Sequence, residues 1–218
     1  MTRSLVIALD GPAASGKGTI SRLLSEHYGF AYLDTGTLYR GVAALMLAQC
    51  VDPHDAARAE KIAQNYDVTQ IAGIAIRTKE VGAAASVVAA NPGVRAALLD
   101  YQQRFARQPP NNAIGSILDG RDIGTVVCPE ADVKFFVTAS PEVRARRRWA
   151  ELAEVNPAIE QAAILKDLLE RDARDSARDD APMVAASDAE LLDTTHLSID
   201  AAFAAARRVI DGVFRCCD

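Results

Sequence analysis

The sequence contains few cysteines and lacks a long hydrophobic run. Only four of its 218 residues are cysteines, and no two of them are spaced as in a C-x-x-C motif. This scarcity excludes a disulfide-rich secreted domain and is typical of a reducing compartment. The apolar run in "MTRSLVIALDGP" is too short for a signal peptide or a membrane span. We therefore expect a cytoplasmic protein with no membrane partner, in which Cys216 and Cys217 are free thiols.

Positive charge and histidine are also scarce. The 24 lysines and arginines are outnumbered by 29 acidic residues, which gives a formal net charge of -5. We therefore expect no nucleic-acid partner, and any anion must be bound by a local cluster of positive charges. The three histidines, His27, His54 and His196, belong to no catalytic arrangement. Half of the residues are hydrophobic, so the chain has enough apolar surface for the core of a globular domain.

Short apolar runs that suit buried strands alternate with longer helical segments. We expect a helix from about Lys17 to Tyr28, ended by Gly29, and two later helices capped by Ser140 and Ser198. This alternation predicts an α/β fold with a parallel sheet covered by helices on both faces. The expected strands are residues 5–9, 30–33, 114–118, 133–137 and 191–193.

Two regions interrupt the alternation. Residues 54–107 contain helical segments and the stretch "DVTQIAGIAIRT", for which we expect a small hairpin. The segment "QPPNN" at 108–112 is expected to be a linker back to the core. The second interruption is the arginine run "RARRR" at Arg144–Arg148, followed by a loop signal at Asn156-Pro157.

The segment "GPAASGKGT" has the pattern of a phosphate-binding loop. Its glycines allow successive backbone N–H groups to face an anion, the next helix adds partial positive charge, and Lys17 adds a full one. The segment follows an expected strand and opens an expected helix, as this mechanism requires. The alternative is a tight strand-to-helix turn with a surface lysine. The residues expected to contact a bound triphosphate are Gly11, Pro12, Ala13, Ala14, Ser15, Gly16, Lys17, Gly18 and Thr19.

One detail of the loop narrows the class of protein. Gly18 stands where a Ser or Thr usually follows the lysine, and the hydroxyl comes one place later at Thr19. The form "GKGT" is typical of nucleoside monophosphate kinases. The sequence has no N-K-x-D motif, which argues against guanine-specific switch proteins. We therefore expect the loop to hold ATP, whose terminal phosphate passes to a small acceptor.

Four further segments resemble one family, the bacterial cytidylate kinases. They are "LDTGTLYR", "RTKEVGAAASVVA" with "NPGVRAALL" after it, "DGRDIGTVV" and "ERDARDSAR", and they occur in family order over nearly the whole chain. The resemblance implies a single P-loop kinase domain with a five-stranded parallel sheet, a monophosphate-binding insertion and an arginine-rich lid. In this interpretation the core is residues 1–36, 112–143 and 158–218, the insertion is about 37–111, and the lid is about 144–157.

The resemblance also implies roles for individual residues. Arginine suits the acceptor phosphate because its planar fork makes two parallel hydrogen bonds. Cytosine shows an amino donor beside acceptors, so a carboxylate and an arginine complement it. Thr35, Arg40, Arg121 and Arg178 match the positions that hold the acceptor phosphate, Ser86, Arg95 and Asp122 those that bind cytosine, and Arg171 and Asp175 those near the ribose.

Each of these groups has a simpler explanation. Arg171, Asp175 and Arg178 are spaced as a salt-bridged, solvated helix face, and Asp122 beside Arg121 is typical of a loop ion pair. Arg95 also suits an exposed position on an alanine-rich helix. The run "RARRR" resembles the family's lid, with an exposed basic helix face as the alternative. Within it, Arg144 and Arg148 lie one turn apart and are expected to repel each other unless an anion is bound.

The chemistry expected of such a site needs no general base. The acceptor phosphate has a second pKa of about 6, so its oxygen is already ionised at neutral pH. Catalysis is expected to consist of alignment and neutralisation of charge, in part by Mg²⁺. Thr19 is expected to position the metal, in part through water, with Asp119 as a weaker outer candidate. The catalytic residues expected are Lys17, Arg121, Arg148 and Arg178.

The sequence departs from the family in one place. The segment between "DVTQ" and "RTKEV" is shorter than the small sheet usual there, so we expect a truncated monophosphate-binding subdomain. Two alternatives remain: a kinase of another monophosphate such as UMP or AMP, and a regulatory protein that binds nucleotides without transfer. The partners expected are small-molecule nucleotides, and the protein is expected to be a monomer.

Overall fold

The computed structural model describes residues 4–71, 73–154 and 157–215. Cys216 and Cys217, interpreted above as free thiols, and Asn156 of the expected loop lie outside these ranges. The chain divides into two compact units. The first contains residues 1–33 and 106–218, and the second contains Asp34–Phe105. The unit boundaries fall near those expected for the insertion, and each unit is described by itself.

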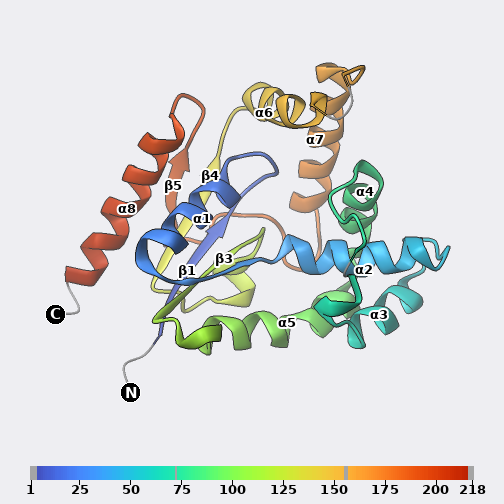
Figure 1. Cartoon of the computed structure of the whole chain (residues 1–218), viewed down its shortest axis with the longest axis horizontal. Coiled ribbons are helices and arrows are strands. Elements are labelled where there is room, and N and C mark those ends of the chain that lie inside the picture. The colour runs from blue at the N-terminus through green and yellow to red at the C-terminus, as the bar shows by residue number, and fades with distance from the viewer. Residues whose placement is uncertain (1–3, 72, 155–156, 216–218) are drawn as a thin grey trace. The chain divides into compact units, whose positions relative to one another are not determined.

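The first unit is built on a five-stranded sheet (Figure 1). The strand order is β2-β3-β1-β4-β5. β1 is parallel to both β3 and β4, and β4 is parallel to β5, so the prediction of a five-stranded parallel sheet is confirmed. The strands are β1 (Leu5–Asp10), β2 (Ala31–Asp34), β3 (Gly115–Asp119), β4 (Val133–Thr138) and β5 (Glu190–Asp193).

The register places the strand ends that matter for function at one edge. Leu9 of β1 lies opposite Asp119 of β3, and Thr138 of β4 lies opposite Asp193 of β5. In open parallel sheets ligands bind outside the carboxyl ends of the strands. The loops that follow β1 and β3 therefore start side by side at the edge where a ligand is expected.

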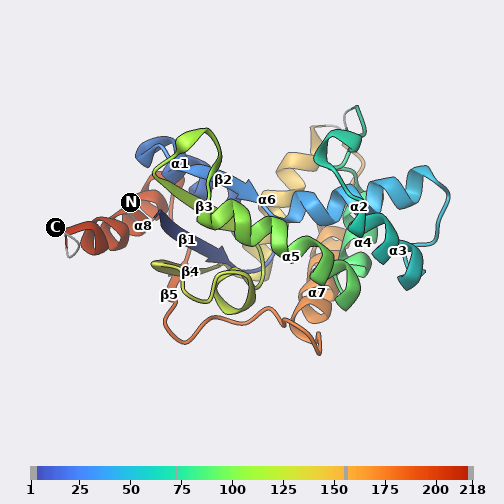
Figure 2. The ribbon, with the colours of Figure 1, turned by 90° about the horizontal axis from the view of Figure 1, so that it is seen from below.

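Helices cover the sheet, as the apolar strand runs predicted. α1 and α8 pack on the face that includes Ile7, Leu9 and Phe135 (Figures 1 and 2). On the opposite face, the Ser116 hydroxyl donates to the Ala106 carbonyl at the end of α5, at 2.9 Å. The helices of this unit are α1 (Lys17–Tyr28), α6 (Pro141–Ala153), α7 (Gln161–Ser176) and α8 (Ile199–Arg215).

The predicted helix ends are confirmed by their local chemistry. Gly29 ends α1 in the left-handed region, at φ 67°, which glycine adopts without a steric penalty. The Ser140 hydroxyl accepts the Val143 N–H at the start of α6, and the Ser198 hydroxyl accepts the Ala201 N–H at the start of α8. These caps satisfy backbone donors that a helix start leaves without partners.

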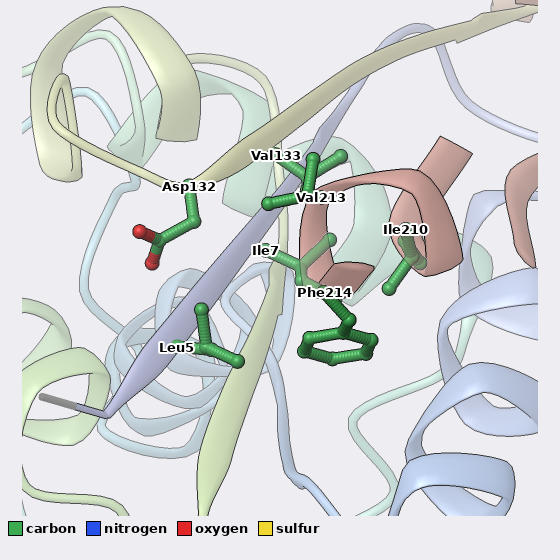
Figure 3. A pocket seen from close by; sticks show the side chains of 7 residues that line it. All are labelled: Leu5, Ile7, Asp132, Val133, Ile210, Val213 and Phe214. Atoms are coloured by element: carbon green, nitrogen blue, oxygen red, sulfur yellow. The ribbon is translucent and has the colours of Figure 1, made fainter. Parts of the chain in front are cut away.

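A small cavity lies at the amino-terminal end of the sheet, where β1 and β4 begin (Figure 3). Its volume is about 10 Å³, roughly that needed for one water. One carboxylate lies at its rim: the Oδ2 atom of Asp132 accepts the Val6 N–H at 2.8 Å. The cavity is a packing feature at the sheet end opposite the expected ligand edge. Its lining residues are Leu5, Ile7, Asp132, Val133, Ile210, Val213 and Phe214.

The second unit is helical. Its core packs α2 against α4, with Val42, Met46 and Val88 fully buried. A Cβ atom at Gly41 would lie 2.1 Å from the Tyr66 hydroxyl oxygen, so only glycine allows this phenol ring to pack against the helix. The helices are α2 (Gly36–Ala48), α3 (Ala56–Gln64), α4 (Lys79–Val88) and α5 (Pro92–Arg107), with the 3₁₀ turn η1 (Val68–Ile71); the last two residues of α5 belong to the first unit.

The prediction of a hairpin in "DVTQIAGIAIRT" is wrong. This segment begins with η1, and its described residues form no strand. The Asp67 carboxylate accepts both the backbone N–H and the hydroxyl of Thr69 at 2.8 Å, a local turn that competes with extended pairing. The expected linker at 108–112 includes a short 3₁₀ turn, η2 (Pro110–Asn112).

In the part of the chain that the structure describes, no single helix has the length and apolar character needed to cross a membrane. The helix pair Lys79–Val88 and Pro92–Asn112 has that length and apolar composition only when the two helices are taken together. The two helices are bent by 98° relative to each other.

Candidate active site

The loop between β1 and α1 has the backbone of an anion site. Gly11 and Gly16 have φ values of 137° and 94°, which few residues other than glycine adopt. A Cβ atom at Gly11 would lie 2.0 Å from the Val137 carbonyl oxygen of β4, so this entry to the loop admits no side chain. α1 has no acidic residue in its first turn and no side-chain cap. Its first N–H groups therefore suit a bound phosphate.

Lys17 is held within this loop. Its ammonium group donates to the Pro12 carbonyl at 3.2 Å, and the residue is only 7% exposed. The lysine therefore curls over the loop, as a phosphate-binding lysine does, and the alternative of a surface lysine on a turn is wrong.

The loop is also braced from β5 and α6 by two residues that the sequence interpretation missed. The Thr194 hydroxyl donates to the Ser15 carbonyl at 2.8 Å. Arg147 donates to the Thr194 hydroxyl at 2.9 Å and to its carbonyl at 2.7 Å. Two sequence signals point to this brace: Thr194 directly follows an expected strand, and Arg147 belongs to the run "RARRR".

Glycine at position 18 lies beside two polar groups, which a Cβ atom there would meet at ordinary van der Waals distances. A Cβ atom there would lie 3.4 Å from Asp119 Oδ2 and 3.6 Å from the Tyr32 hydroxyl oxygen. Tyr32 donates to the same Asp119 oxygen at 2.7 Å. A carboxylate and a phenol from β3 and β2 thus approach the place where a serine or threonine side chain would project.

An arginine cluster surrounds Asp175 near the end of α7. Arg121 Nε lies 3.0 Å from Asp175 Oδ2, Arg171 Nε lies 3.8 Å from the same oxygen, and Arg178 contacts the other oxygen. Burial alone would raise the pKa of Asp175, but the charges of Arg121, Arg178 and Arg171 outweigh it and lower that pKa. Three arginines converge on this one carboxylate, and such a concentration of positive charge suits an anion.

The cluster contradicts the simpler explanation of a solvated helix face. Asp175 is 1% exposed, so Arg171, Asp175 and Arg178 do not form a solvated helix face. Arg121 forms an ion pair with Asp175, 54 residues away, and the local loop pair with Asp122 stays a prediction. The expected acceptor-phosphate residues of the first unit are therefore brought together.

The arginine run lies on α6, and its members differ in their surroundings. Arg144 is 4% exposed, lies 2.6 Å from Asp172 Oδ2 of α7 and donates to the Ala139 carbonyl. The expectation that Arg144 and Arg148 repel each other unless an anion is bound is wrong, because Asp172 already neutralises Arg144. Arg148 pairs with Glu151 at 2.8 Å and is partly exposed, while Arg146 is exposed.

The second unit holds the other predicted substrate residues. Ser86 of α4 is buried, and its hydroxyl makes no hydrogen bond with any described residue. Arg95 of α5 is 7% exposed and lies over the Tyr39 ring at 5.9 Å, so the alternative of an exposed charge is wrong. Thr35 occupies the N-cap position of α2, and Arg40 lies 3.6 Å from Asp34.

One groove of the second unit is separate from these residues. Its volume is about 270 Å³, and none of the predicted site residues lines it. Its lining residues are Leu45, Gln49, Arg58, Lys61, Ile62, Asn65 and Gln70.

Comparison with known proteins identifies relatives of this chain. The sequence model of the family "Cytidylate kinase" matches residues 7–211. A cytidylate kinase from Azorhizobium caulinodans is 55% identical over 207 residues, which cover 95% of this chain and 98% of the relative. A cytidylate kinase from Xanthobacter autotrophicus is 56% identical over 207 residues, which cover 95% and 97%.

Two solved structures share the fold at low sequence identity. An uncharacterized protein from Eubacterium ventriosum has a TM-score of 0.57 at 11% identity and covers 95% of this chain and 98% of its own. Shikimate kinase from Bacteroides thetaiotaomicron has a TM-score of 0.50 at 9% identity, with coverage of 95% and 98%. These likenesses concern the fold alone. The family match spans nearly the whole chain, and the resemblance found in the motifs is confirmed: the chain belongs to the cytidylate kinase family.

Proposed function

We propose that this protein transfers the terminal phosphate of ATP to CMP or dCMP and releases ADP with CDP or dCDP. The observation that carries the proposal is that the first unit contains both a glycine-rich loop with Lys17 and a cluster of three arginines around Asp175, which we interpret as two anion sites. The phosphate-binding loop follows β1, and Arg121 of the arginine cluster follows the neighbouring strand β3. A protein that only binds a nucleotide needs one such site, whereas transfer between two phosphates needs both.

The donor and acceptor phosphates are proposed to meet between these two sites. Lys17 and the N–H groups of the loop hold the donor, and Arg121 and Arg178 hold the acceptor. The acceptor oxygen is ionised at neutral pH, so no side chain has to remove a proton. The work of the site is to align the two phosphates and to neutralise their charge.

Arg148 is proposed to act from the lid over the transferring phosphate. Its pair with Glu151 is solvent-exposed and lies within one helical turn. Such pairs contribute little stability, so Arg148 can exchange Glu151 for a phosphate oxygen at small cost.

The loop region also fits Mg²⁺. This ion is usually held by one or two carboxylates, substrate phosphates and water. Asp119 and the Thr19 hydroxyl are the groups proposed to hold it, in part through water, and Asp119 Oδ2 lies close to the start of α1 at Gly18. When bound, the ion neutralises negative charge on the phosphates. The described residues contain no cluster of three or more His, Cys, Asp or Glu side chains that could hold a metal.

Cytosine is proposed to be recognised by Ser86, Arg95 and Asp122. A carboxylate complements the amino group of cytosine, and an arginine complements its acceptors. The buried Ser86 hydroxyl supports this assignment, because a buried polar group without a partner is costly until a ligand satisfies it. The remaining assignments are Thr35 and Arg40 to the acceptor phosphate, and Arg171 and Asp175 to the ribose side.

A coupled assay of ADP release tests the function directly. ATP is supplied with CMP, dCMP, UMP or AMP in turn, and we expect turnover with the two cytosine nucleotides to exceed the others. A preference for UMP or AMP would assign the protein to another acceptor. Binding of CMP by calorimetry without turnover would make it a regulatory protein. Fractionation and sizing by light scattering test the expectations of a cytoplasmic monomer.

A further inference from the structure

Asp10 is a buried carboxylate that the proposed mechanism does not use. It is the last residue of β1, directly before the phosphate-binding loop, and it is 4% exposed. Its Oδ1 atom accepts the Ile123 N–H and its Oδ2 atom accepts the Gly124 N–H, both at 2.7 Å. One side chain therefore holds two consecutive amides that lie more than 110 residues further along the chain.

These two amides begin the short helical turn η3 (Ile123–Val127). The first N–H groups of a helical turn have no acceptor within it and need one from elsewhere. An aspartate at the N-cap position normally supplies that acceptor. Asp122 occupies this position but makes no capping hydrogen bond with its side chain. Asp10 takes over the cap, so the Asp122 carboxylate is not needed for it.

Lys134 also packs against this turn. A Cβ atom at Gly124 would lie 3.1 Å from Lys134 Cδ and 3.4 Å from Asp10 Oδ2. The Lys134 ammonium group is itself fixed by the Asp188 carboxylate and by the Pro129 carbonyl. Residues 121–124 therefore have little freedom to shift.

Keeping Asp10 ionised in this place is costly. Burial raises its pKa from 3.8 to about 6, although the Gly124 and Ile123 N–H groups and the charge of Lys17 lower it; the neighbouring Asp122 carboxylate raises it further. A charge kept at such a cost is common where function requires the geometry that it maintains.

We propose that Asp10 is a positioning residue for acceptor recognition. Its carboxylate caps η3 from a neighbouring strand and so fixes the backbone from which Arg121 and Asp122 reach the acceptor phosphate and the cytosine amino group. This inference rests on the proposed function, in which Asp122 distinguishes cytosine from uracil. Asp10 itself touches no substrate.

The test is Asp10→Asn, which keeps the size of the side chain. The amide retains one acceptor and turns an NH₂ group toward the second backbone N–H, so one contact is lost. We expect the ratio of kcat/KM for CMP over UMP to fall roughly tenfold, within the range of one good base-edge contact. KM for CMP should rise, and KM for ATP should stay close to that of the wild type.

Asp132→Asn is the matched control. Asp132 also accepts a backbone N–H with its carboxylate, from Val6 at the opposite end of β1 (Figure 3). The same chemical change there should leave the CMP/UMP ratio unchanged. The ratio does not depend on how much of the enzyme is folded, so a purely structural loss does not move it.

The outcomes separate this inference from the proposed function. If Asp10→Asn lowers kcat/KM for CMP and UMP by one factor, or raises only KM for ATP, Asp10 serves the phosphate-binding loop and the proposal is overturned. If Asp122→Ala also leaves the ratio intact, the cytosine assignment fails with it. Should Asp10→Asn not fold, Gly124→Ala tests the same contact from the other side. It should lower the CMP/UMP ratio, and an unchanged ratio would refute the proposal.

Discussion

At the scale of the residue, the most informative feature is that four charged side chains predicted to belong to the site are buried. Lys17, Arg95, Asp122 and Asp175 are all buried. Charged side chains are seldom buried unless they are paired or bind a ligand. Removing any one of these charges is therefore expected to lower the activity of the protein more than its stability.

Lys17→Ala tests the phosphate-binding loop. Lys17 is proposed to stabilise charge that moves during transfer, so its loss should lower kcat by about 10²–10³-fold, as the loss of one oriented charge-stabilising donor does in other enzymes. The measurement is the coupled assay at saturating ATP and CMP, with circular dichroism to confirm folding. Lys61→Ala, a change of an exposed lysine on α3, is the control. Near-native turnover of Lys17→Ala would show that the loop does not hold the transferred phosphate.

Asp122→Ala tests base selection. Cytosine presents an amino donor where uracil presents a carbonyl acceptor, so the carboxylate attracts one base and repels the other. In the variant, the stabilisation of bound CMP should fall by about 1–3 kcal/mol, and that of UMP by less. The measurement is kcat/KM for both substrates. An equal loss for CMP and UMP would place cytosine selectivity elsewhere in the chain.

At the scale of the element, α7 connects the arginines proposed to hold the acceptor with α6, the proposed lid. Asp175 holds Arg121, Arg171 and Arg178, while Asp172, one turn earlier, holds Arg144 of α6. One helix thus supplies the carboxylates for two groups of arginines. Changes in the two carboxylates should have separable effects on activity and on stability.

Asp175→Asn should lower kcat/KM for CMP and dCMP together, by about tenfold or more, because a charged hydrogen bond contributes about 1.5–3 kcal/mol and Asp175 orients three arginines. Arg171→Ala should instead change the CMP/dCMP ratio, since Arg171 is assigned to the ribose side. Both ratios come from steady-state assays of the two substrates. If Asp175→Asn lowers kcat/KM for CMP and leaves that for dCMP unchanged, the main role of Asp175 is contact with the ribose 2′-hydroxyl.

Arg144→Ala should destabilise the first unit. Breaking a buried ion pair usually costs 3–5 kcal/mol, and we expect about 2–3 kcal/mol here because Asp172 keeps some contact with water. The measurement is chemical denaturation followed by circular dichroism. Arg148→Ala is the matched control on the same helix, and as a surface change it should stay within about 0.5 kcal/mol. Equal stability of the two variants would contradict a structural role for Arg144.

At the scale of the whole molecule, the stability of the fold should depend on the ionisation of Asp10. A carboxyl group whose pKa is raised on folding binds its proton more tightly in the folded state. It therefore stabilises the fold at low pH, and this contribution is lost as the pH rises from about 4 to about 6. The shift of about two units corresponds to roughly 3 kcal/mol.

Asp10→Asn removes this titration. The Tm of the variant minus the Tm of the wild type should increase by roughly 5–10 °C from pH 4 to pH 7. This estimate uses about 2–4 °C per kcal/mol for a chain of this size. Differential scanning calorimetry across this range measures it. A difference that stays constant with pH would mean that Asp10 has an ordinary pKa in the folded protein.

The sequence by itself determined the parallel sheet, most helix ends, the phosphate-binding loop and the family. These features follow from short-range patterns: apolar runs of strand length, a serine before a helix, and glycines before a lysine. In "DVTQIAGIAIRT" the alternation of polar and apolar residues led to a wrong prediction of strands, because the hydrogen bonds between Asp67 and Thr69 form a local turn there.

Only the tertiary structure decided which partners the charged side chains find. Asp10 reaches Gly124 across 114 positions, Arg121 reaches Asp175 across 54, and Arg144 meets Asp172 of the next helix. No local spacing encodes such contacts, because burial and pairing depend on which distant segments the sheet and helices bring together. Arg144 and Arg148 look alike in "RARRR", yet one is an internal ion pair and the other faces water, because Asp172 packs against only one of them.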